Sequence, residues 1–205
     1  MATIVVGGSG KGVGKTTLIC GLIAALPEFR WTAVKITSHD HGQPGRILEY
    51  TRQGAEDTSQ GAEDARQDAG AAQGTDTARY LAAGAERALL VSALPHEFGE
   101  TVGELIRAEG PQAHLIFESN RILGFLKPDV CLLLHGCMER ASWKPSFNLV
   151  ARQADAMVEC CEADLMLKHS AISRPVFQLA ALDKISPEML GWLRMRLSAV
   201  AMAHA

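Results

Sequence analysis

The chain has 205 residues, of which 47% are hydrophobic and 21% are charged, and its formal net charge is −3. This composition is that of an ordinary globular protein, and the length predicts one domain over residues 1–205 with a substantial core. The 20 basic and 23 acidic residues form no basic stripe with interleaved aromatic side chains, which argues against nucleic-acid binding.

The chain also lacks the marks of a membrane or exported protein. No apolar run is long enough to cross a bilayer, and the N-terminus enters a strand without a basic region or a cleavage site. The five cysteines are scattered through apolar segments and include no C-x-x-C pair. This pattern favours a reducing compartment, so we expect a cytoplasmic protein with no membrane partner.

A glycine-rich stretch close to the N-terminus, residues 7–17, is the most informative part of the sequence. It reads G-G-S-G-K-G-V-G-K-T-T and lies between the apolar runs 3–6 and 18–26. A buried strand, a glycine-rich turn and an apolar helix are the context that a phosphate-binding P-loop needs. Small residues let backbone N–H groups converge on phosphate oxygens, and the helix N-terminus adds partial positive charge. The residues predicted to hold a nucleoside triphosphate are Ser9, Gly10, Lys11, Gly12, Val13, Gly14, Lys15, Thr16 and Thr17.

Two of these side chains have distinct predicted roles. Lys15 is expected to reach the β- and γ-phosphates, and the hydroxyl of Thr16 is expected to complete a Mg²⁺ shell. In the pattern G-x-x-x-x-G-K-[ST], the first glycine falls on position 9, where this chain has Ser9. No G-x-G-x-x-G register exists, so a Rossmann interpretation has no support. The alternative is a structural glycine-rich turn that binds nothing.

Strands and helices alternate along the rest of the chain. The predicted strands are residues 31–37, 87–92, 114–117, 130–134, 155–158 and 175–179. The predicted helices are residues 74–84, 97–108, 146–154 and a last helix that opens at Ser186 and Pro187, with a buried stripe of Met189, Leu193, Leu197 and Val200. This alternation predicts an α/β fold, the three-layer P-loop NTPase fold, with a mostly parallel sheet and helices on both faces.

Residues 51–74 differ from the rest in composition. They contain no Val, Ile, Leu, Met, Phe, Tyr or Trp, and they carry five acids and two bases, an excess equal to the whole net charge. Such a segment buries too little apolar surface to offset its ordering entropy. We therefore predict a flexible insertion; a transient helix is the competing interpretation, because Ala, Gln and Glu favour helices.

Two carboxylates, Asp40 and Glu118, each follow a predicted strand. The carboxyl ends of parallel strands meet at one edge of a sheet, where active residues collect. With Lys15 they are the predicted catalytic residues, and with Thr16 they are the predicted metal-binding residues, orienting Mg²⁺ or its waters. The alternative for each is a capping or surface carboxylate.

Several other residues carry weaker signals. His39 and His41 flank Asp40, but without a third ligand they favour contact with a pterin or a phosphate over a zinc site. Cys160 and Cys161 are expected to be buried as small apolar residues. The helix at 74–84 is expected to have a Thr or Asp cap, and Asp76 is most simply that cap.

Three blocks taken together resemble the molybdopterin-guanine dinucleotide biosynthesis protein B (MobB) family. They are the P-loop, residues 34–41 with the sequence V-K-I-T-S-H-D-H, and residues 74–85 with the sequence G-T-D-T-A-R-Y-L-A-A-G-A. The strand that ends in Glu118 is similar to the family's later strand ending in a glutamate. The resemblance spans about the first 120 residues.

This resemblance implies a GTP-binding, weakly hydrolysing P-loop protein that assists a molybdopterin guanylyltransferase partner and forms a homodimer. The sequence departs from the family pattern in three places. Ser119 follows Glu118 where the family has glycine, residues 51–74 lengthen a short connection, and K-G-G-x-G-K is shortened around Lys11. No N-K-x-D guanine motif occurs, so the preference for GTP over ATP rests on the resemblance.

Two other functions remain open. One is an ATP-dependent small-molecule kinase or synthetase with the same core, which would use Lys35, Asp40 and Glu118 around an organic acceptor. The other is a nucleotide-gated metal chaperone that uses His39, His41 or the cysteines. Weak hydrolysis fits the sequence, because no arginine finger can be assigned within the chain.

Overall fold

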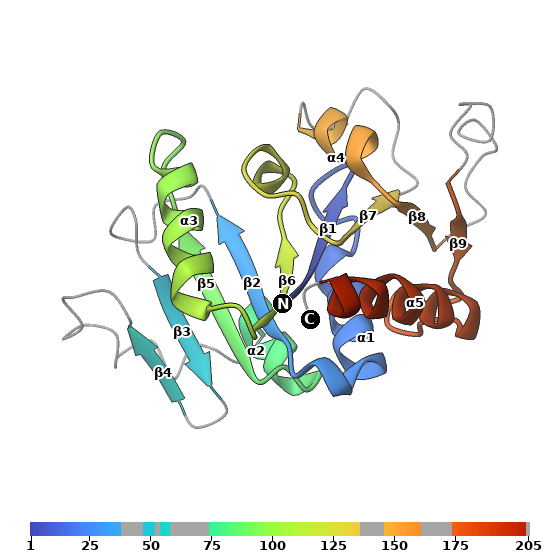
Figure 1. Cartoon of the computed structure of the whole chain (residues 1–205), viewed down its shortest axis with the longest axis horizontal. Coiled ribbons are helices and arrows are strands. Elements are labelled where there is room, and N and C mark those ends of the chain that lie inside the picture. Colours follow the sequence, from blue (N-terminus) through green and yellow to red (C-terminus); the bar gives the residue numbers. More distant parts are fainter. Residues whose placement is uncertain (38–46, 52–53, 58–73, 136–145, 161–173, 204–205) are drawn as a thin grey trace.

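The computed structural model describes residues 1–37, 47–51, 54–57, 74–135, 146–160 and 174–203. Their nine strands form one sheet in the order β4-β3-β5-β2-β6-β1-β7-β8-β9 (Figure 1). Neighbouring strands pair in parallel, except that β3 is antiparallel to both β5 and β4. The predicted α/β fold with a mostly parallel sheet is confirmed.

The elements agree closely with the predicted ranges, except that β3, β4 and the two 3-10 turns were not predicted. The strands are β1 Ala2–Gly8, β2 Thr32–Thr37, β3 Ile47–Thr51, β4 Gly54–Asp57, β5 Arg87–Ser92, β6 His114–Glu118, β7 Val130–His135, β8 Ala156–Glu159 and β9 Val176–Gln178. The helices are α1 Lys15–Ala25, α2 Asp76–Ala82, α3 Phe98–Glu109, α4 Phe147–Gln153 and α5 Pro187–Ala203, with 3-10 turns η1 Pro27–Phe29 and η3 Arg121–Gly124.

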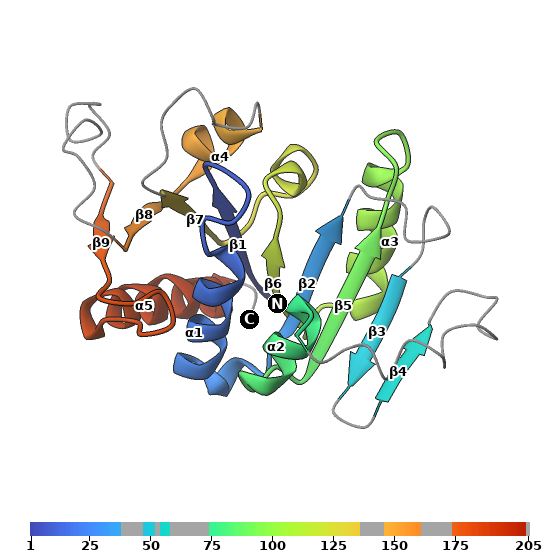
Figure 2. The ribbon, with the colours of Figure 1, turned by 180° about the vertical axis from the view of Figure 1, so that it is seen from behind.

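Helices cover both faces of the sheet. The apolar side chains of α1, α2 and α5 form one core cluster with the sheet, and those of α3, η3 and α4 form the other (Figure 2). All seven residues of β1 are buried, and they alternate between the clusters: Ile4 and Val6 face the first, and Val5 faces the second. A strand covered on both faces needs apolar residues at every position, which is why β1 reads as a continuous hydrophobic run.

The strand order brings three carboxyl ends together. β6 lies between β2 and β1, and Glu118 is in register with Lys35 on one side and with Val6 on the other. The P-loop leaves the same edge, because it joins the end of β1 to the start of α1. The fold therefore places Lys35, Glu118 and the P-loop side by side.

The prediction for residues 51–74 is wrong at its start. Thr51 ends β3, and residues 54–57 form β4, which pairs antiparallel with β3 at the edge of the sheet. An edge strand is held by backbone hydrogen bonds to a single neighbour, so it can form without the apolar side chains whose absence suggested disorder. Residues 58–73 lie outside the described residues.

The C-terminal helix carries the predicted stripe as far as its side chains are described. Met189, Leu193 and Leu197 are buried in the first core cluster, and the backbone N–H of Met189 donates to Ser186 Oγ at 3.3 Å, as the predicted cap requires. The side chain of Val200 lies outside the described part. No helix of the described residues is long and apolar enough to span a bilayer.

Candidate functional site

The P-loop ends in a helix N-terminus that is open to an anion. Gly14 is the N-cap of α1 and has φ 96°, and Gly12 has φ 75°, a left-handed region that favours glycine. The cap makes no side-chain hydrogen bond, and the first turn contains no acid. The N–H groups of a first helical turn have no acceptor within the helix, so an anion can bind here without displacing a side-chain cap.

Ser9 explains why the departure from the P-loop pattern is tolerated. It is fully buried, and its backbone N–H donates to the carbonyl of Leu134 at 3.2 Å. Among the described residues other than glycine, only Arg30 has a positive φ, so the backbone at position 9 does not require glycine. A small residue is sufficient there.

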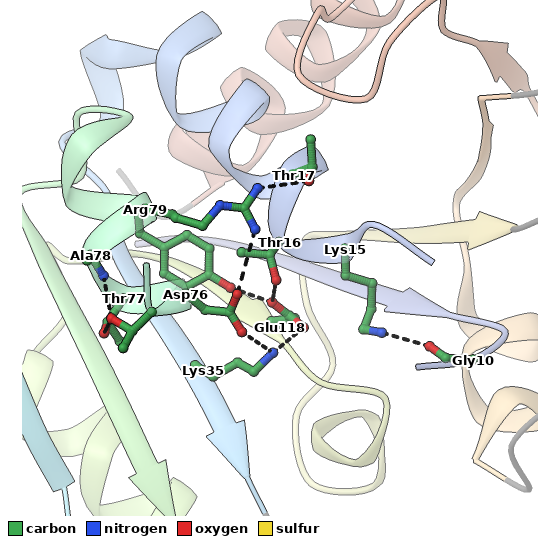
Figure 3. Close-up of polar contacts among 12 residues, drawn as sticks. Gly10, Lys15, Thr16, Thr17, Lys35, Asp76, Thr77, Ala78, Arg79 and Glu118 are labelled. Atoms are coloured by element: carbon green, nitrogen blue, oxygen red, sulfur yellow. Dashed lines mark hydrogen bonds and ion pairs between the residues drawn. The ribbon is translucent and has the colours of Figure 1, made fainter. Parts of the chain in front are cut away.

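Lys15 lies across the loop. Its Nζ donates to the carbonyl oxygen of Gly10 at 3.0 Å (Figure 3). A lysine that donates to a backbone carbonyl can exchange this hydrogen bond for a charge-assisted one to a phosphate oxygen. Lys11 is exposed, and Val13 is half-buried against the first core cluster.

Glu118 is the centre of a cluster of hydrogen bonds. Its Oε2 accepts from Thr16 Oγ1 at 2.7 Å and from the hydroxyl of Tyr80, and its Oε1 accepts from Lys35 Nζ (Figure 3). Its side chain is 6% exposed. A buried carboxylate with three donors is held in one orientation.

Asp76 completes the group. Its Oδ2 lies 3.0 Å from Lys35 Nζ, and its Oδ1 lies 3.8 Å from Arg79 Nη1. Arg79 in turn donates from Nη2 to Thr17 Oγ1 at 2.9 Å, which ties α2 to the first turn of α1. We call Thr16, Lys35, Asp76, Tyr80 and Glu118 the carboxylate cluster.

The expected capping role of Asp76 is wrong. The N-cap of α2 is Thr75, whose side chain accepts from the backbone N–H of Ala78 at 3.3 Å. Asp76 is free to turn toward the site because the cap is supplied by its neighbour. The signal that could have identified it was its place inside the 74–85 block of the family resemblance.

The charges in the carboxylate cluster stabilise one another. Burial lowers the pKa of Lys35, but the charge and hydrogen bond of Glu118, together with Asp76, outweigh burial and raise it above its usual value. Burial raises the pKa of Asp76, but the hydrogen bond and charge of Lys35 outweigh it and hold this pKa below its usual value. Burial and then the charge of Glu118 raise the pKa of Tyr80, so its hydroxyl stays protonated and donates.

Asn120 joins the P-loop to the end of β6, a role that the sequence analysis missed. Its Oδ1 accepts from the N–H of Gly8 and its Nδ2 donates to the carbonyl of Gly8, both at 2.9 Å. Nδ2 also donates to Ser146 Oγ at 3.2 Å. A side-chain amide paired with one backbone amide in this way fixes the start of the loop.

These elements surround a cleft of about 660 Å³. Of the predicted site residues, those that line the cleft are Lys11, Gly12, Gly14, Lys15, Thr16, Thr17 and Glu118. Its charged lining comprises five cations, Lys11, Lys15, Lys35, Arg79 and Arg121, and two carboxylates, Asp76 and Glu118. The excess of positive charge suits a polyanion.

The donor atoms also suit Mg²⁺, a hard cation that prefers oxygen ligands. Thr16 Oγ1 and Glu118 Oε2 are close together at the N-terminus of α1, and Asp76 adds carboxylate oxygen in the same cleft. Because Thr16 donates its proton to Glu118, the lone pairs of the Thr16 oxygen remain available to a cation.

Some sequence predictions fall elsewhere. Asp40, His39 and His41 lie outside the described residues, as does Cys161. Cys160 is exposed, so its expected burial is wrong; it directly follows the last residue of β8, beyond the packed part of the strand. Among the described residues, no group of three or more His, Cys, Asp or Glu side chains is placed to hold a metal ion.

No family model matches the chain, and no curated protein matches it. A crystal structure described as the "apo" form of LpxK from Aquifex aeolicus in complex with ATP is similar, with a TM-score of 0.50 and 18% identity. The match covers 87% of this chain and 53% of that one, so the chain spans about half the length of this structural neighbour. At this identity the similarity shows only the fold, an α/β fold with a mostly parallel sheet and helices.

Proposed function

We propose that the protein binds a nucleoside triphosphate with Mg²⁺ in this cleft and hydrolyses it slowly. One observation carries the proposal: the P-loop, Lys35 of β2, Asp76 and Arg79 of the 74–85 block, and Glu118 meet in one cleft. These are the segments on which the resemblance to MobB rests, and they are far apart in the sequence. The resemblance supports GTP as the nucleotide, with ATP as the alternative.

The roles of the residues follow from their contacts. The first turn of α1 and Lys15 would bind the phosphates, and Thr16 with Glu118 would hold Mg²⁺ and orient its waters. Mg²⁺, when bound, neutralises charge on the phosphate oxygens. Lys35 favours the ionised form of Asp76 and holds the carboxylates of Asp76 and Glu118 in place through its contacts with both. Lys35, the one cation of the carboxylate cluster, is already paired with Asp76 and Glu118, which supports slow hydrolysis without a partner.

The biological role proposed from the resemblance is accessory. The protein would act in the cytoplasm as a homodimer and assist a molybdopterin guanylyltransferase in attaching a guanine nucleotide. The rival role is an ATP-dependent small-molecule kinase or synthetase. Turnover of the purified protein distinguishes the two, since an accessory protein alone stays well below typical enzyme rates of about 10 s⁻¹, whereas a kinase supplied with its acceptor does not.

Lys15→Ala tests the nucleotide site. Binding of GTP and of ATP is measured by calorimetry at fixed Mg²⁺ for the wild type, Lys15→Ala and Lys127→Ala, an exposed lysine that does not line the cleft. We expect Lys15→Ala to weaken triphosphate binding by about 100-fold or more, because it removes the charge paired with the phosphates, and to remain folded. Equal affinities in a folded Lys15→Ala variant would overturn the proposal.

A further inference from the structure

We infer that Arg121 forms a second oxyanion subsite in the cleft. This subsite receives a phosphate or carboxylate group of a second ligand, one that binds in addition to the nucleoside triphosphate. This inference rests on the proposed function, because it assigns a binding partner to the same cleft. Arg121 opens η3, soon after β6 ends at Glu118, and lines the same cleft as the first turn of α1, although η3 and α1 pack in different core clusters. Figure 1 shows η3 and the start of α3 at the edge of the sheet from which the P-loop leaves.

The flat face of the Arg121 guanidinium stacks on an aromatic ring. Its Cζ lies 4.5 Å from the ring centroid of Phe98, and that ring is buried and packs against Phe125 at 5.2 Å between centroids. A guanidinium stacked on an aromatic ring is fixed in orientation, while the N–H groups at its edge stay available. Phe98 also lines the cleft, so this stacked pair belongs to the cleft wall.

Arg121 differs from the other arginine of the cleft in its partners. Arg79 contacts Asp76 and Thr17, whereas in the part of the chain that the structure describes no ion pair or hydrogen bond joins Arg121 to another side chain. A half-buried, oriented guanidinium with unused donors is a site for a planar or tetrahedral oxyanion, which it can bind through two parallel hydrogen bonds.

The surroundings favour an anion over a cation or an apolar group. Ser119, Asn120 and Ser146 also line the cleft, and these neutral side chains add no negative charge to its wall. The two carboxylates of the cleft, Asp76 and Glu118, are both bonded to Lys35, so neither is left to balance Arg121. The triphosphate would occupy the P-loop side, which leaves Arg121 for a different oxyanion.

The test is a phosphate titration of the protein with its P-loop filled. A non-hydrolysable GTP analogue and Mg²⁺ are bound first, and inorganic phosphate is then titrated by calorimetry, with acetate in a parallel series. We expect Arg121→Gln to weaken phosphate or acetate binding by at least about tenfold, beyond any change in affinity for the analogue. A phosphate-only response would assign a phosphorylated ligand, and a response to both anions would include carboxylates.

Arg107→Gln is the matched control, because Arg107 is an exposed arginine outside the cleft for which no ion pair is found among the described residues. It should bind both anions like the wild type. Absence of oxyanion binding in the wild type, or equal binding by Arg121→Gln, would overturn the subsite. A fall in hydrolysis by Arg121→Gln with unchanged oxyanion affinity would assign Arg121 to the triphosphate itself and would also overturn it.

A repeat of the titration in Lys15→Ala without nucleotide separates the two proposals. If the analogue fails to bind the wild type, the proposed function fails. Phosphate binding that still depends on Arg121 in the Lys15→Ala background would then support the subsite on its own, and its absence would remove the subsite as well.

Discussion

Two cations in the same cleft, Lys35 and Arg121, are held in different ways. Lys35 is bonded to Glu118 and Asp76 within the carboxylate cluster, and its side chain is 24% exposed. Arg121 rests on the ring of Phe98, with no carboxylate bonded to it in the described part of the chain. The role of a cation in the cleft therefore depends on whether a carboxylate of the chain is bonded to it. A paired cation stabilises and orients the fold's own carboxylates, whereas an unpaired one keeps its donors for a ligand.

The largest expected effect is that of Lys35→Met on stability. It leaves the buried carboxylate of Glu118 without its cation and next to a second acid, so we expect a loss of about 3 kcal/mol near neutral pH. Urea unfolding of the wild type and the variant measures it. Lys127→Met is the control, because Lys127 is exposed, and it should change stability by less than about 0.5 kcal/mol. Equal stabilities would mean that the pairing of Lys35 contributes nothing.

The pH dependence of that loss provides a second measurement. In the wild type the pKa of Asp76 lies below its usual 3.8, so the stability from this carboxylate is present above that pH and is lost as the pH falls through the lowered value. Without Lys35, the effect of burial on the pKa of Asp76 is opposed only by the Thr16 hydrogen bond and the charge of Arg79, so this pKa rises above its wild-type value. The variant therefore takes up a proton at higher pH and loses the repulsion between Asp76 and Glu118. We therefore expect the difference between wild type and Lys35→Met to shrink between about pH 7 and about pH 4. A constant difference would show that Lys35 stabilises through packing rather than charge.

Glu118→Gln should have the next largest effect. The amide keeps the shape of the carboxylate and removes its charge, but Lys35 still has Asp76 as its ion-pair partner. We therefore expect the free energy of unfolding to fall by about 2 kcal/mol. Hydrolysis should also fall and require more Mg²⁺, because the residue that orients Thr16 is weakened. The measurements are urea unfolding and hydrolysis rate against Mg²⁺ concentration, with the exposed Glu104→Gln as the control. Superimposable Mg²⁺ curves would exclude Glu118 from the metal site.

Asp76→Asn tests the second carboxylate that pairs with Lys35. Asp76 is 35% exposed, and solvent screens its attraction to Lys35, so we expect a loss of about 0.5–1 kcal/mol. Unfolding by urea is again the measurement. A loss as large as that of Glu118→Gln would show that the two carboxylates share the charge of Lys35 equally.

The smallest expected effect on stability is that of Arg121→Gln. The variant removes a cation–π contact and breaks no ion pair, so it should cost about 0.5 kcal/mol or less. A loss above about 2 kcal/mol would contradict the contrast with Lys35, because it would reveal a structural role for the unpaired cation.

The sequence alone determined the P-loop and most of the sheet. The P-loop is a local pattern, in which strand, turn and helix follow one another within 26 residues, so its geometry depends little on the rest of the chain. The buried strands could be recognised as apolar runs, because a parallel sheet covered on both faces tolerates polar residues at few positions. Glu118 could be predicted at the site for a related reason: it ends a recognisable strand, and strand ends gather at one edge.

The tertiary structure alone decided which side chains meet in the cleft. Tyr80 reaches Glu118 across 38 residues of sequence, Lys35 reaches it across 83, and Asn120 reaches Gly8 across 112. No local pattern encodes such pairs, because they depend on β6 lying between β2 and β1. For the same reason, the sequence did not identify Asp76 as a site residue or Arg121 as an unpaired cation. It did not identify β4 either, because this edge strand is held by backbone pairing rather than by apolar side chains.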